Sequence, residues 1–335
     1  MRTVHHIYAV VFTFVLAATL PSYGEEYPGC HGAFDQSSAM CSKFNFEGQR
    51  PCINPTNGTT FYDISGLPEV NEVDPHTRKM ASLITNVFEE GDTTFAYASC
   101  LDIGDKRGYT CGYAGFTTGT SDAETVVHEY SKILSNNALV PFLSRLQEIG
   151  QVPYCDQESR GKVHGLESFC HAWRREACRW DQTFSKLQRD WTYKYYMLPS
   201  ARYAAAYNIE SRLGKAIFYD AIIQHGYQYV EPDINIMRLL ELTGPRSNNE
   251  SERSYLTRFL TTRRQLQCCY PDNVWPASAS RSADLQHLVD NFDANKDLTK
   301  PVWLNNFRQL VLGTEDDLTD RKRCRRRRIK SIKGR

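Results

Sequence analysis

Eleven cysteines limit what this chain can fold into, because every disulfide requires two segments to lie side by side. Zinc sites built from cysteines usually show Cys-x2-4-Cys spacings, and none occurs here beyond the adjacent pair Cys268-Cys269. We therefore predict disulfides formed in an oxidising compartment. Because the count is odd, at least one cysteine stays free, is removed or pairs between molecules, and our candidate is Cys324. The cysteines are Cys30, Cys41, Cys52, Cys100, Cys111, Cys155, Cys170, Cys178, Cys268, Cys269 and Cys324.

The first 24 residues have the pattern of a secretory signal peptide. Arg2 precedes an apolar stretch, residues 7–20, and small residues follow at the usual spacing for cleavage before Glu25. The apolar stretch is shorter than the roughly 20 residues that span a bilayer, so we expect a secreted, extracellular protein with no stable membrane insertion. If a eukaryotic cell secretes the chain, it is a candidate glycoprotein with sequons at Asn57-Gly58-Thr59 and Asn249-Glu250-Ser251.

Charge is distributed unevenly along the chain. The formal net charge is +1, from 40 basic and 39 acidic residues. Ten basic residues lie between Arg321 and Arg335 and one more, Arg2, in the leader, which leaves 29 basic against 39 acidic residues and a body near −10. The basic end has no interleaved aromatic residues for base stacking, so we expect no nucleic-acid binding. We predict a disordered, basic tail that can contact anionic cell-wall or cell-surface polymers.

Composition and periodicity divide the chain into four predicted segments. They are a signal peptide (1–24), a Cys-containing N-terminal extension (25–73), a main domain (74–314) and the basic tail (315–335). The main domain is predicted to be α+β and mainly α, with one small β region.

The boundaries of several elements carry local signals. Asp74-Pro75 is an N-cap followed by proline at the first helical position, and the apolar face that follows predicts a helix ending near Gly91. Aromatic, Thr-rich and Gly-rich sequence over residues 94–120 predicts short strands and tight turns. A capping box, Ser121-x-x-Glu124, predicts the start of the next helix. Further helices are predicted at about 141–149, 166–195, 209–224, 233–242, 252–267 and 282–292.

Two carboxylates are candidates for acid–base chemistry. Asp105 lies in the segment GDKRGYT, residues 104–110, whose two glycines predict a tight turn, and Glu89 lies at the end of the preceding predicted helix. Taken alone, the segment around Asp105 is explained as a charged hairpin turn. Taken alone, Glu89 is explained as an ordinary surface glutamate. A carboxyl group on a helix end and another on a facing turn are nevertheless what glycoside hydrolysis requires, one protonated acid and one ionised group.

A second pair of charged residues interrupts two apolar helix faces. Asp220 falls on or beside the apolar face of residues 209–224, and Arg263 falls on that of residues 252–267. A buried charge without a partner is unfavourable, so we hypothesise that the two side chains meet. A purely structural ion pair and a role in supporting catalysis both stay open.

Two further patterns have simpler interpretations. Residues 293–297 resemble the start of a calcium-binding loop, but the glycine and glutamate needed at positions 6 and 12 are missing, so we predict no metal site. Trp173, Trp180, Trp191 and the region of residues 193–196 could offer sugar-stacking faces, although aromatic residues at helical spacing are more typical of a core.

Several separated motifs stand in order along the chain: VFEE (87–90), DKRGYTCG (105–112), AGFTTGTSD (114–122), FYDAIIQHG (218–226) and YLTRFLTTR (255–263). Together, over roughly residues 74–312, they resemble the chitosanases of glycoside hydrolase family 46. The resemblance implies an endo-acting, inverting hydrolase of the β-1,4 linkages between glucosamine residues in chitosan or partly deacetylated chitin. It also implies a lysozyme-like, two-lobed fold with a small β-sheet and a substrate cleft between the lobes. No metal or organic cofactor and no partner subunit are expected.

The resemblance also implies roles for individual residues. Glu89 would be the general acid, with Glu90 beside it as the alternative, and Asp105 would be the general base. Thr110 would help to place the attacking water. Residues implied to contact substrate or border the cleft are Arg107, Asp122, Gly115 and His225, and those matching the family's buried support network are Asp220 and Arg263.

Two other functions stay open beside this one. One is a lysozyme-like hydrolase of acetylated chitin or peptidoglycan, and the other is a catalytically silent aminoglycan-binding protein. Asp122 and the acidic body favour free amines over acetamides, which supports chitosan as the substrate. The intact set of Glu89, Asp105 and Thr110 argues against a silent protein.

Overall fold

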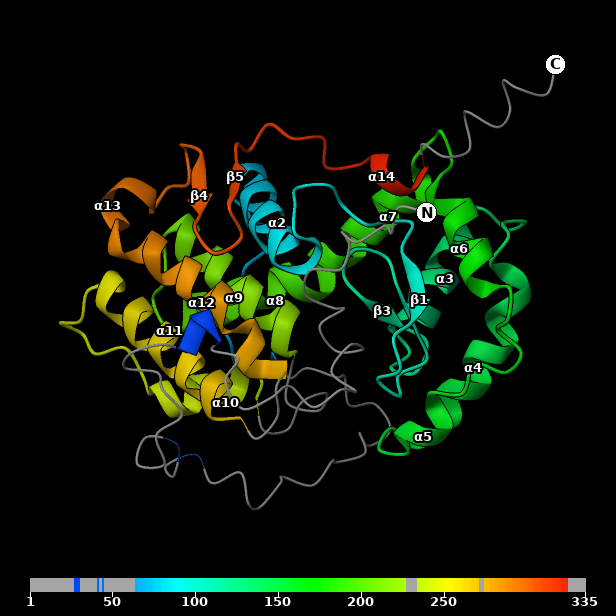
Figure 1. Ribbon diagram of the computed structural model, residues 1–335, viewed down its shortest axis with the longest axis horizontal. Coiled ribbons are helices and arrows are strands. Elements are labelled where there is room, and N and C mark those ends of the chain that lie inside the picture. Colours follow the sequence, from blue (N-terminus) through cyan, green and yellow to red (C-terminus); the bar gives the residue numbers. More distant parts are fainter. Residues whose placement is uncertain are drawn as a thin grey trace, which may run out of the picture. The chain divides into compact units, whose positions relative to one another are not determined.

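The computed structural model describes residues 27–30, 41, 44, 64–226, 234–270 and 274–324 (Figure 1). Within these residues the chain is mainly helical with small antiparallel sheets, as predicted. It forms two compact units, unit 1 from residues 1–91 and 195–315 and unit 2 from residues 92–194 and 316–335. The main domain predicted for residues 74–314 contains parts of both units. The predicted signal peptide, most of the predicted extension and Asn57 lie outside the described residues.

Helix α2 (Pro75–Glu90) of unit 1 begins and ends where its capping residues predict. The Asp74 carboxylate accepts a hydrogen bond from the Thr77 amide at 3.1 Å, and Pro75 follows it. At the other end Gly91 has φ 78°, and its amide donates to the carbonyl of Val87 at 2.9 Å. The left-handed backbone conformation at this position favours glycine, and it ends the helix. The buried face of α2 packs against α9 (Arg212–His225).

The remaining elements of unit 1 are mostly helices. Helix α12 begins eight residues earlier than predicted, and it packs against α11 and against η3. The hairpin of β4 and β5 was not predicted, because each strand has only three residues, too few to establish an alternating pattern. These elements are η3 (Pro28–Cys30), α8 (Leu198–Ala206), α10 (Ile236–Thr243), α11 (Glu252–Cys269), α12 (Val274–Asp290), α13 (Phe292–Asn295), β4 (Val302–Leu304) and β5 (Gln309–Val311).

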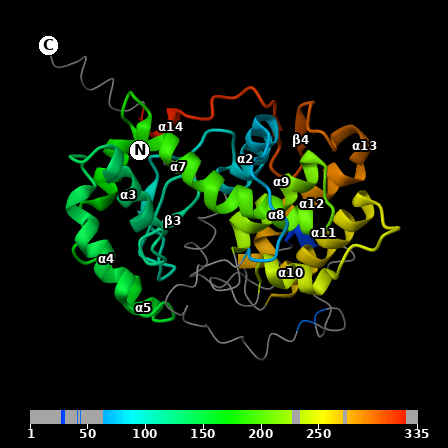
Figure 2. The ribbon, with the colours of Figure 1, turned by 180° about the vertical axis from the view of Figure 1, so that it is seen from behind.

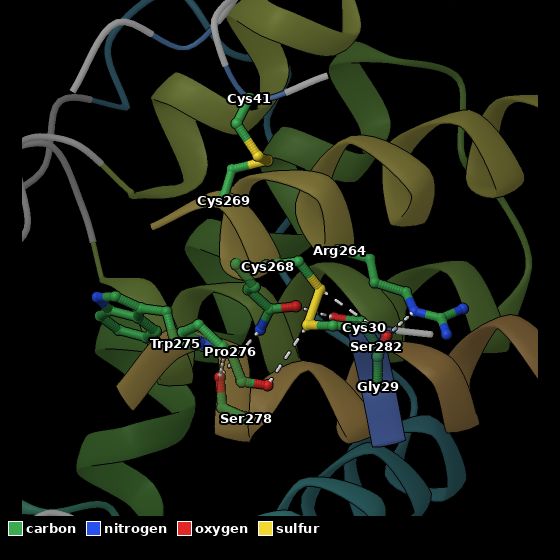
Figure 3. Close-up of a disulfide and its surroundings, with 11 residues drawn as sticks. Gly29, Cys30, Cys41, Arg264, Cys268, Cys269, Trp275, Pro276, Ser278 and Ser282 are labelled. Carbon is green, nitrogen blue, oxygen red and sulfur yellow. Dashed lines mark hydrogen bonds between the residues drawn. A yellow bond between two sulfur atoms is a disulfide. The ribbon is translucent and has the colours of Figure 1, made fainter. Parts of the chain in front are cut away.

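Two disulfides tie the N-terminal extension to the end of α11. Cys30 pairs with Cys268 and Cys41 pairs with Cys269 (Figure 3). The Arg264 side chain also donates to the carbonyl of Gly29. Cys30 and Cys268 are buried together with Ala279 of α12 in a small apolar cluster. The extension is therefore anchored to the helices of unit 1 at the cysteines that the structure describes.

Unit 2 contains a three-stranded antiparallel sheet in the order β1-β2-β3. Its strands are β1 (Cys100–Asp102), β2 (Tyr109–Cys111) and β3 (Phe116–Thr117), and Thr110 pairs with Leu101 on one side and Thr117 on the other. The helices are α3 (Asp122–Ile133), α4 (Leu143–Gln151), α5 (Gln157–Arg160), α6 (Phe169–Ala177), α7 (Thr183–Thr192) and α14 (Arg321–Cys324), with the 3-10 turn η6 (Val140–Phe142). The π-helical segment η7 (Tyr193–Met197) follows α7. No helix in the described parts of the chain is both long and apolar enough to cross a membrane.

The tryptophans of unit 2 divide into core and surface residues. Trp173 is fully buried and donates from Nε1 to the carbonyl of Tyr97 at 2.9 Å, and Trp191 is also buried against Phe116. Both therefore belong to the core, as their spacing indicated. Trp180 lies between α6 and α7 with 91% of its surface exposed.

Helix α3 begins where predicted but is capped differently. Ser121 has φ 73° and makes no capping hydrogen bond, and its hydroxyl instead accepts from the Arg160 guanidinium at 2.6 Å. The next residue supplies the acceptor, because Asp122 Oδ1 accepts from the Ala123 amide at 2.9 Å. The predicted capping box is therefore wrong, since Arg160 binds the serine hydroxyl that would have capped the helix.

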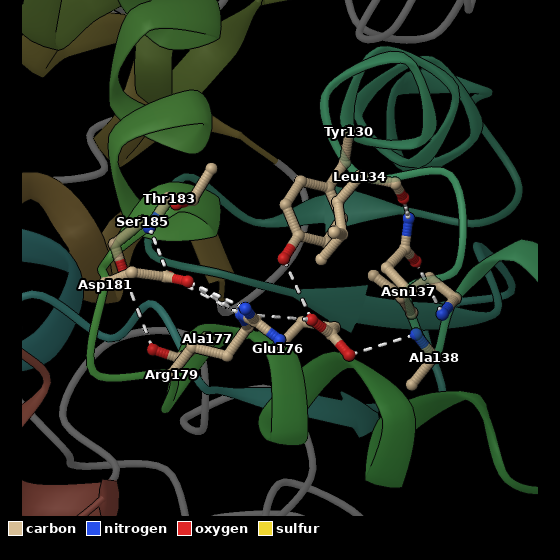
Figure 4. A network of polar contacts seen from close by, with 11 residues as sticks. Tyr130, Leu134, Asn137, Ala138, Glu176, Ala177, Arg179, Asp181, Thr183 and Ser185 are labelled. Carbon is tan, nitrogen blue, oxygen red and sulfur yellow. Dashed lines mark hydrogen bonds and ion pairs between the residues drawn. The ribbon is translucent and has the colours of Figure 1, made fainter.

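A buried carboxylate connects the end of α6 to the segment after α3. Glu176 is buried, and its Oε2 accepts from the Tyr130 hydroxyl at 2.8 Å (Figure 4). Its Oε1 accepts from the Ala138 amide at 3.0 Å, and Arg179 lies 3.8 Å from Oε2. Both oxygens of a buried acid are thus satisfied, which holds these helices together.

The segment after residue 315 corrects two predictions. Cys324 forms a disulfide with Cys178, so it is not the odd cysteine. Helix α14 lies beside α7 in both views (Figures 1 and 2), and Arg189 Nη1 of α7 lies 3.0 Å from Asp317 Oδ2. The predicted disordered tail is therefore wrong for its first ten residues, 315–324. Residues 316–324 belong to unit 2, to which a disulfide and polar contacts tie them. Residues 325–335 lie outside the described residues.

Candidate active site

Glu89 is held by a buried arginine that the sequence did not single out. It stands in the last turn of α2, and its Oε1 lies 2.7 Å from Nη1 of Arg281 on α12. The Glu89 side chain is 18% exposed and the Arg281 side chain 1% exposed. The carboxyl group is thus positioned from the protein interior while part of it stays accessible.

Arg281 also connects Glu89 to the pair predicted from the helix faces. Asp220 Oδ1 lies 2.7 Å from Arg281 Nη2, and Asp220 Oδ2 forms an ion pair of 2.8 Å with Arg263 Nη1. The hypothesis that Asp220 and Arg263 meet is therefore confirmed. The Thr85 hydroxyl adds a hydrogen bond to Asp220 at 3.2 Å. Two guanidinium groups and two carboxyl groups alternate in this network.

Burial and neighbouring charges have opposite effects on the pKa values of the side chains in this network. Burial acts to raise the pKa of Asp220, but Arg281 and Arg263 hold that pKa below its ordinary value. Burial likewise acts to lower the pKa of Arg281, while Asp220 and Glu89 raise it above its ordinary value. For Arg263 burial dominates and lowers the pKa to about 10, although Asp220 opposes the change. All three side chains are consequently charged near neutral pH.

His225 lies at the inner end of the same network. Its ring is fully buried, Nε2 accepts from Arg263 Nε at 3.1 Å, and the ring packs on Trp275 with centroids 4.8 Å apart. Burial, with Arg263 and Arg281 nearby, lowers the pKa of His225 well below its ordinary value. The imidazole is therefore neutral near pH 7. In the structure the partner of the ring is Arg263. The predicted contact of His225 with substrate stays a prediction.

Asp105 lies in the turn between β1 and β2. Gly104 and Gly108 both have φ 75°, and Lys106 between them has φ 65°, so the turn uses left-handed backbone that favours glycine. Asp105 Oδ1 accepts from the Arg107 amide at 3.0 Å, and Arg107 Nε lies 3.9 Å from Asp105 Oδ2. The carboxylate is 21% exposed. It is thus fixed by its own turn and reachable from solvent.

Thr110 provides a hydroxyl in the strand that follows this turn. Its Oγ1 is buried and has no hydrogen-bond partner among the described residues. Gly115, with φ 69°, leaves open space nearby, since a Cβ there would meet only the Thr110 methyl at 3.7 Å. A hydroxyl in this state can bind a water molecule.

The Asp122 carboxylate accepts hydrogen bonds from residues of its own unit. Its Oδ1 accepts from the Thr117 amide and the Thr120 hydroxyl, both at 2.8 Å, besides capping α3. Burial raises the pKa of Asp122 to about 6, although these hydrogen bonds lower it. The predicted contact of Asp122 with a glucosamine ammonium stays a prediction.

Each of the two units contains some of the predicted site residues. Unit 1 holds Glu89, Asp220, Arg263 and His225, and unit 2 holds Asp105, Arg107, Thr110, Gly115 and Asp122. Arg281 is the functional candidate that sequence reasoning missed, because α12 was predicted to start after it. The signal was present, since Arg281, Leu285 and Leu288 follow at i, i+4 and i+7 on one buried stripe.

Comparisons with known proteins place these residues in a family context. The sequence model of glycosyl hydrolase family 46 matches residues 83–302. A chitosanase of Bacillus subtilis (strain 168) is 29% identical over 235 residues, which cover 69% of this chain and 78% of that protein. A second chitosanase, from Streptomyces sp. (strain N174), is 29% identical over 196 residues, 57% of this chain and 66% of that protein.

Solved structures of chitosanases share the fold. The GH46 chitosanase GsCsn46A of Gynuella sunshinyii, in complex with chitotetraose, is 27% identical with a TM-score of 0.61, covering 72% of this chain and 98% of that chain. A mutant chitosanase from Bacillus subtilis MY002, complexed with 6 GlcN, is 26% identical with the same TM-score of 0.61, covering 72% and 99%. The predicted lysozyme-like chitosanase fold is confirmed by these similarities.

Proposed function

Since this chain belongs to glycoside hydrolase family 46, we propose that it hydrolyses the β-1,4 linkages between glucosamine residues within chitosan. Its relatives are chitosanases, and related structures bind chitotetraose or 6 GlcN. The observation that carries the proposal is Glu89, a partly exposed carboxyl group held at 2.7 Å by the buried Arg281. A carboxyl group positioned in this way, with a second one at Asp105, suits the acid–base chemistry of glycoside hydrolysis.

The proposed mechanism moves one proton at each carboxyl group. Glu89, as general acid, donates its proton to the glycosidic oxygen as the bond to the anomeric carbon breaks. A water molecule attacks that carbon from the opposite face, and Asp105, as general base, accepts a proton from this water. The Thr110 hydroxyl, which has no partner among the described residues, orients the water. Inversion requires about 6.5–9.5 Å between the two carboxyl groups.

Substrate contacts are proposed at the residues that the family resemblance indicates. Arg107 would fix the Asp105 carboxylate through its backbone amide, and Asp122 would interact with a glucosamine ammonium. Gly115 leaves room beside Thr110 for the water or the sugar. His225 would act from within unit 1, through Arg263. No step of this mechanism uses a metal or an organic cofactor.

Product analysis on soluble chitosan tests the proposal. Anomer-resolved NMR should show the α-anomer first, and initial release of the β-anomer would contradict inversion. Glu89→Gln and Asp105→Asn should each lower the rate by at least about 100-fold. Their unfolding temperatures should change little, because glutamine can still accept from Arg281. Retained turnover in either variant would reject its assigned role, and faster cleavage of fully acetylated chitin would reject the substrate.

We also propose that the protein is secreted as a monomer after removal of residues 1–24. Asn249, in an exposed turn, is available for a glycan in a eukaryotic host. The basic end of the chain would contact anionic cell-wall or cell-surface polymers. N-terminal sequencing of the protein from culture medium should begin at Glu25, and a product that retains Met1 would contradict the signal peptide.

A further inference from the structure

Three cysteines of unit 2 share one position in the fold. Cys100 is on β1, Cys111 is on β2, and Cys170 is on α6, and their sulfur atoms all lie within 4.8 Å of one another. The Cys100 sulfur lies close enough to pair with either Cys111 or Cys170. A sulfur atom forms only one disulfide bond, so one cysteine of this cluster must be a thiol at any moment. The odd total of eleven cysteines also requires at least one unpaired cysteine in a monomer.

Backbone spacing indicates which pair forms the resting disulfide. The Cα atoms of Cys100 and Cys111, direct partners in the β1–β2 ladder, are 4.0 Å apart, which is below the usual range of about 4.4–6.8 Å for disulfides. Those of Cys100 and Cys170 are 5.0 Å apart, within that range. Cys111 is fully buried, whereas Cys170 is partly exposed. The resting state therefore has the Cys100–Cys170 disulfide and a buried thiol at Cys111.

We propose that Cys100, Cys111 and Cys170 form an intramolecular thiol–disulfide exchange site. The Cys111 thiol loses its proton and attacks Cys100, so that the Cys111–Cys100 bond forms and the Cys100–Cys170 bond breaks. Cys170 leaves as a thiolate and takes up a proton. One disulfide and one thiol are present before and after the exchange, so no oxidant or reductant is consumed.

The exchange changes which elements are joined. In the resting state the cross-link joins β1 to α6 across 70 residues of sequence, and after exchange it joins β1 to β2 across 11. The second cross-link closes the β1–β2 hairpin, whose turn carries Asp105. Its Cys111 end is the residue that directly follows Thr110. The exchanged state also places the thiol at Cys170, where solvent can reach it. Cys170 thereby becomes a site for modification by soluble thiol-reactive compounds.

Alkylation of the folded protein tests the exchange. Wild-type protein is incubated at pH 8 with N-ethylmaleimide, quenched in acid, digested and mapped by mass spectrometry. Because only the exchanged state exposes the reactive thiol, label should accumulate at Cys170 and approach one per chain. The Cys100–Cys111 peptide should increase in step, while the Cys30–Cys268 and Cys178–Cys324 peptides stay constant.

Two matched variants separate exchange from simple exposure. Cys111→Ser lacks the attacking thiol and should retain the Cys100–Cys170 disulfide, with no label at Cys170. Cys170→Ser should contain only the Cys100–Cys111 disulfide, without label. It should also unfold about 3 °C below Cys111→Ser, because the shorter loop constrains the unfolded chain less.

Several outcomes would overturn the proposal. Label at Cys170 in the Cys111→Ser variant would mean that Cys170 is free without exchange. Label at Cys111 in folded wild type, with the cross-link unchanged, would mean local opening. Three thiols with bound zinc, or no thiol in denatured wild type, would exclude the site. None of these readouts depends on chitosan cleavage, so the proposal fails or stands separately from the proposed function.

Discussion

At the scale of single residues, Thr110 is the most informative position in unit 2. Its Oγ1 is buried without a hydrogen-bond partner in the described structure, and an unsatisfied buried hydroxyl lowers stability. We predict that Thr110→Val lowers kcat on chitosan by about 100-fold through loss of water placement, because small misplacements of reacting groups have effects of this size. The free energy of unfolding should stay equal or increase slightly, which urea unfolding can measure.

A conservative variant serves as the control. Thr110→Ser keeps the hydroxyl and removes only the methyl group that lies near Gly115, so it should retain most of the activity. If Thr110→Val remains fully active, the hydroxyl does not place the water. If both variants lose activity together with stability, the residue serves β2 packing instead.

Residue-level prediction succeeded where a charge interrupted an apolar helix face. Asp220 and Arg263 could be paired from the sequence because a buried charge needs a partner, and they are 2.8 Å apart. Arg281 escaped notice because the predicted helix began after it, which hid its place on a buried stripe. The three-cysteine cluster could not be predicted, since which distant sulfur atoms meet depends on the packing of β1 against α6.

At the scale of elements, the charged network joins four helices of unit 1. Glu89 belongs to α2, Asp220 to α9, Arg263 to α11 and Arg281 to α12. We predict that Arg281→Met lowers the free energy of unfolding by about 3–5 kcal/mol, because it leaves Asp220 with one fewer partner in a buried site. Thermal and urea unfolding would measure this loss.

A lysine at the same position separates positioning from stability. Arg281→Lys keeps the charge but cannot contact Glu89 and Asp220 with two separate nitrogens, so Glu89 should be less well oriented. We expect most of the stability to return while kcat stays at least about 10-fold low, with KM little changed. Full recovery of kcat would show that Arg281 supplies charge only. Arg175→Met, on the exposed face of α6, is the control and should change neither quantity.

Elements were predictable where their ends carry local chemistry. Asp74, Pro75 and Gly91 define both ends of α2 through short-range hydrogen bonds and backbone conformation. The local sequence signal predicted the wrong cap at Ser121, because Arg160, distant in the sequence, donates a hydrogen bond to its hydroxyl. The β4–β5 hairpin and α14 are stabilised by tertiary contacts and a disulfide, so their sequences alone were insufficient.

At the scale of the whole molecule, the chain is an acidic body with a basic end, and chitosan is a polycation. Without the leader and the basic residues from Arg321 onward, the body has a net charge near −10. Long-range attraction between opposite charges raises the rate of association by about 10- to 1000-fold at low salt, and dissolved ions screen it within about 10 Å at 0.1 M.

We therefore predict that kcat/KM on soluble chitosan falls at least about tenfold between 0.01 M and 1 M NaCl, mainly through an increase in KM. Initial rates of reducing-end formation would measure this. Chitotetraose, which carries fewer charges than the polymer, should show a weaker dependence, and thermal unfolding at each salt concentration would verify that the enzyme stays folded. A kcat/KM that is constant or rises with salt would mean that capture depends on short-range contacts, and the net charge of the body would then have no part in substrate binding.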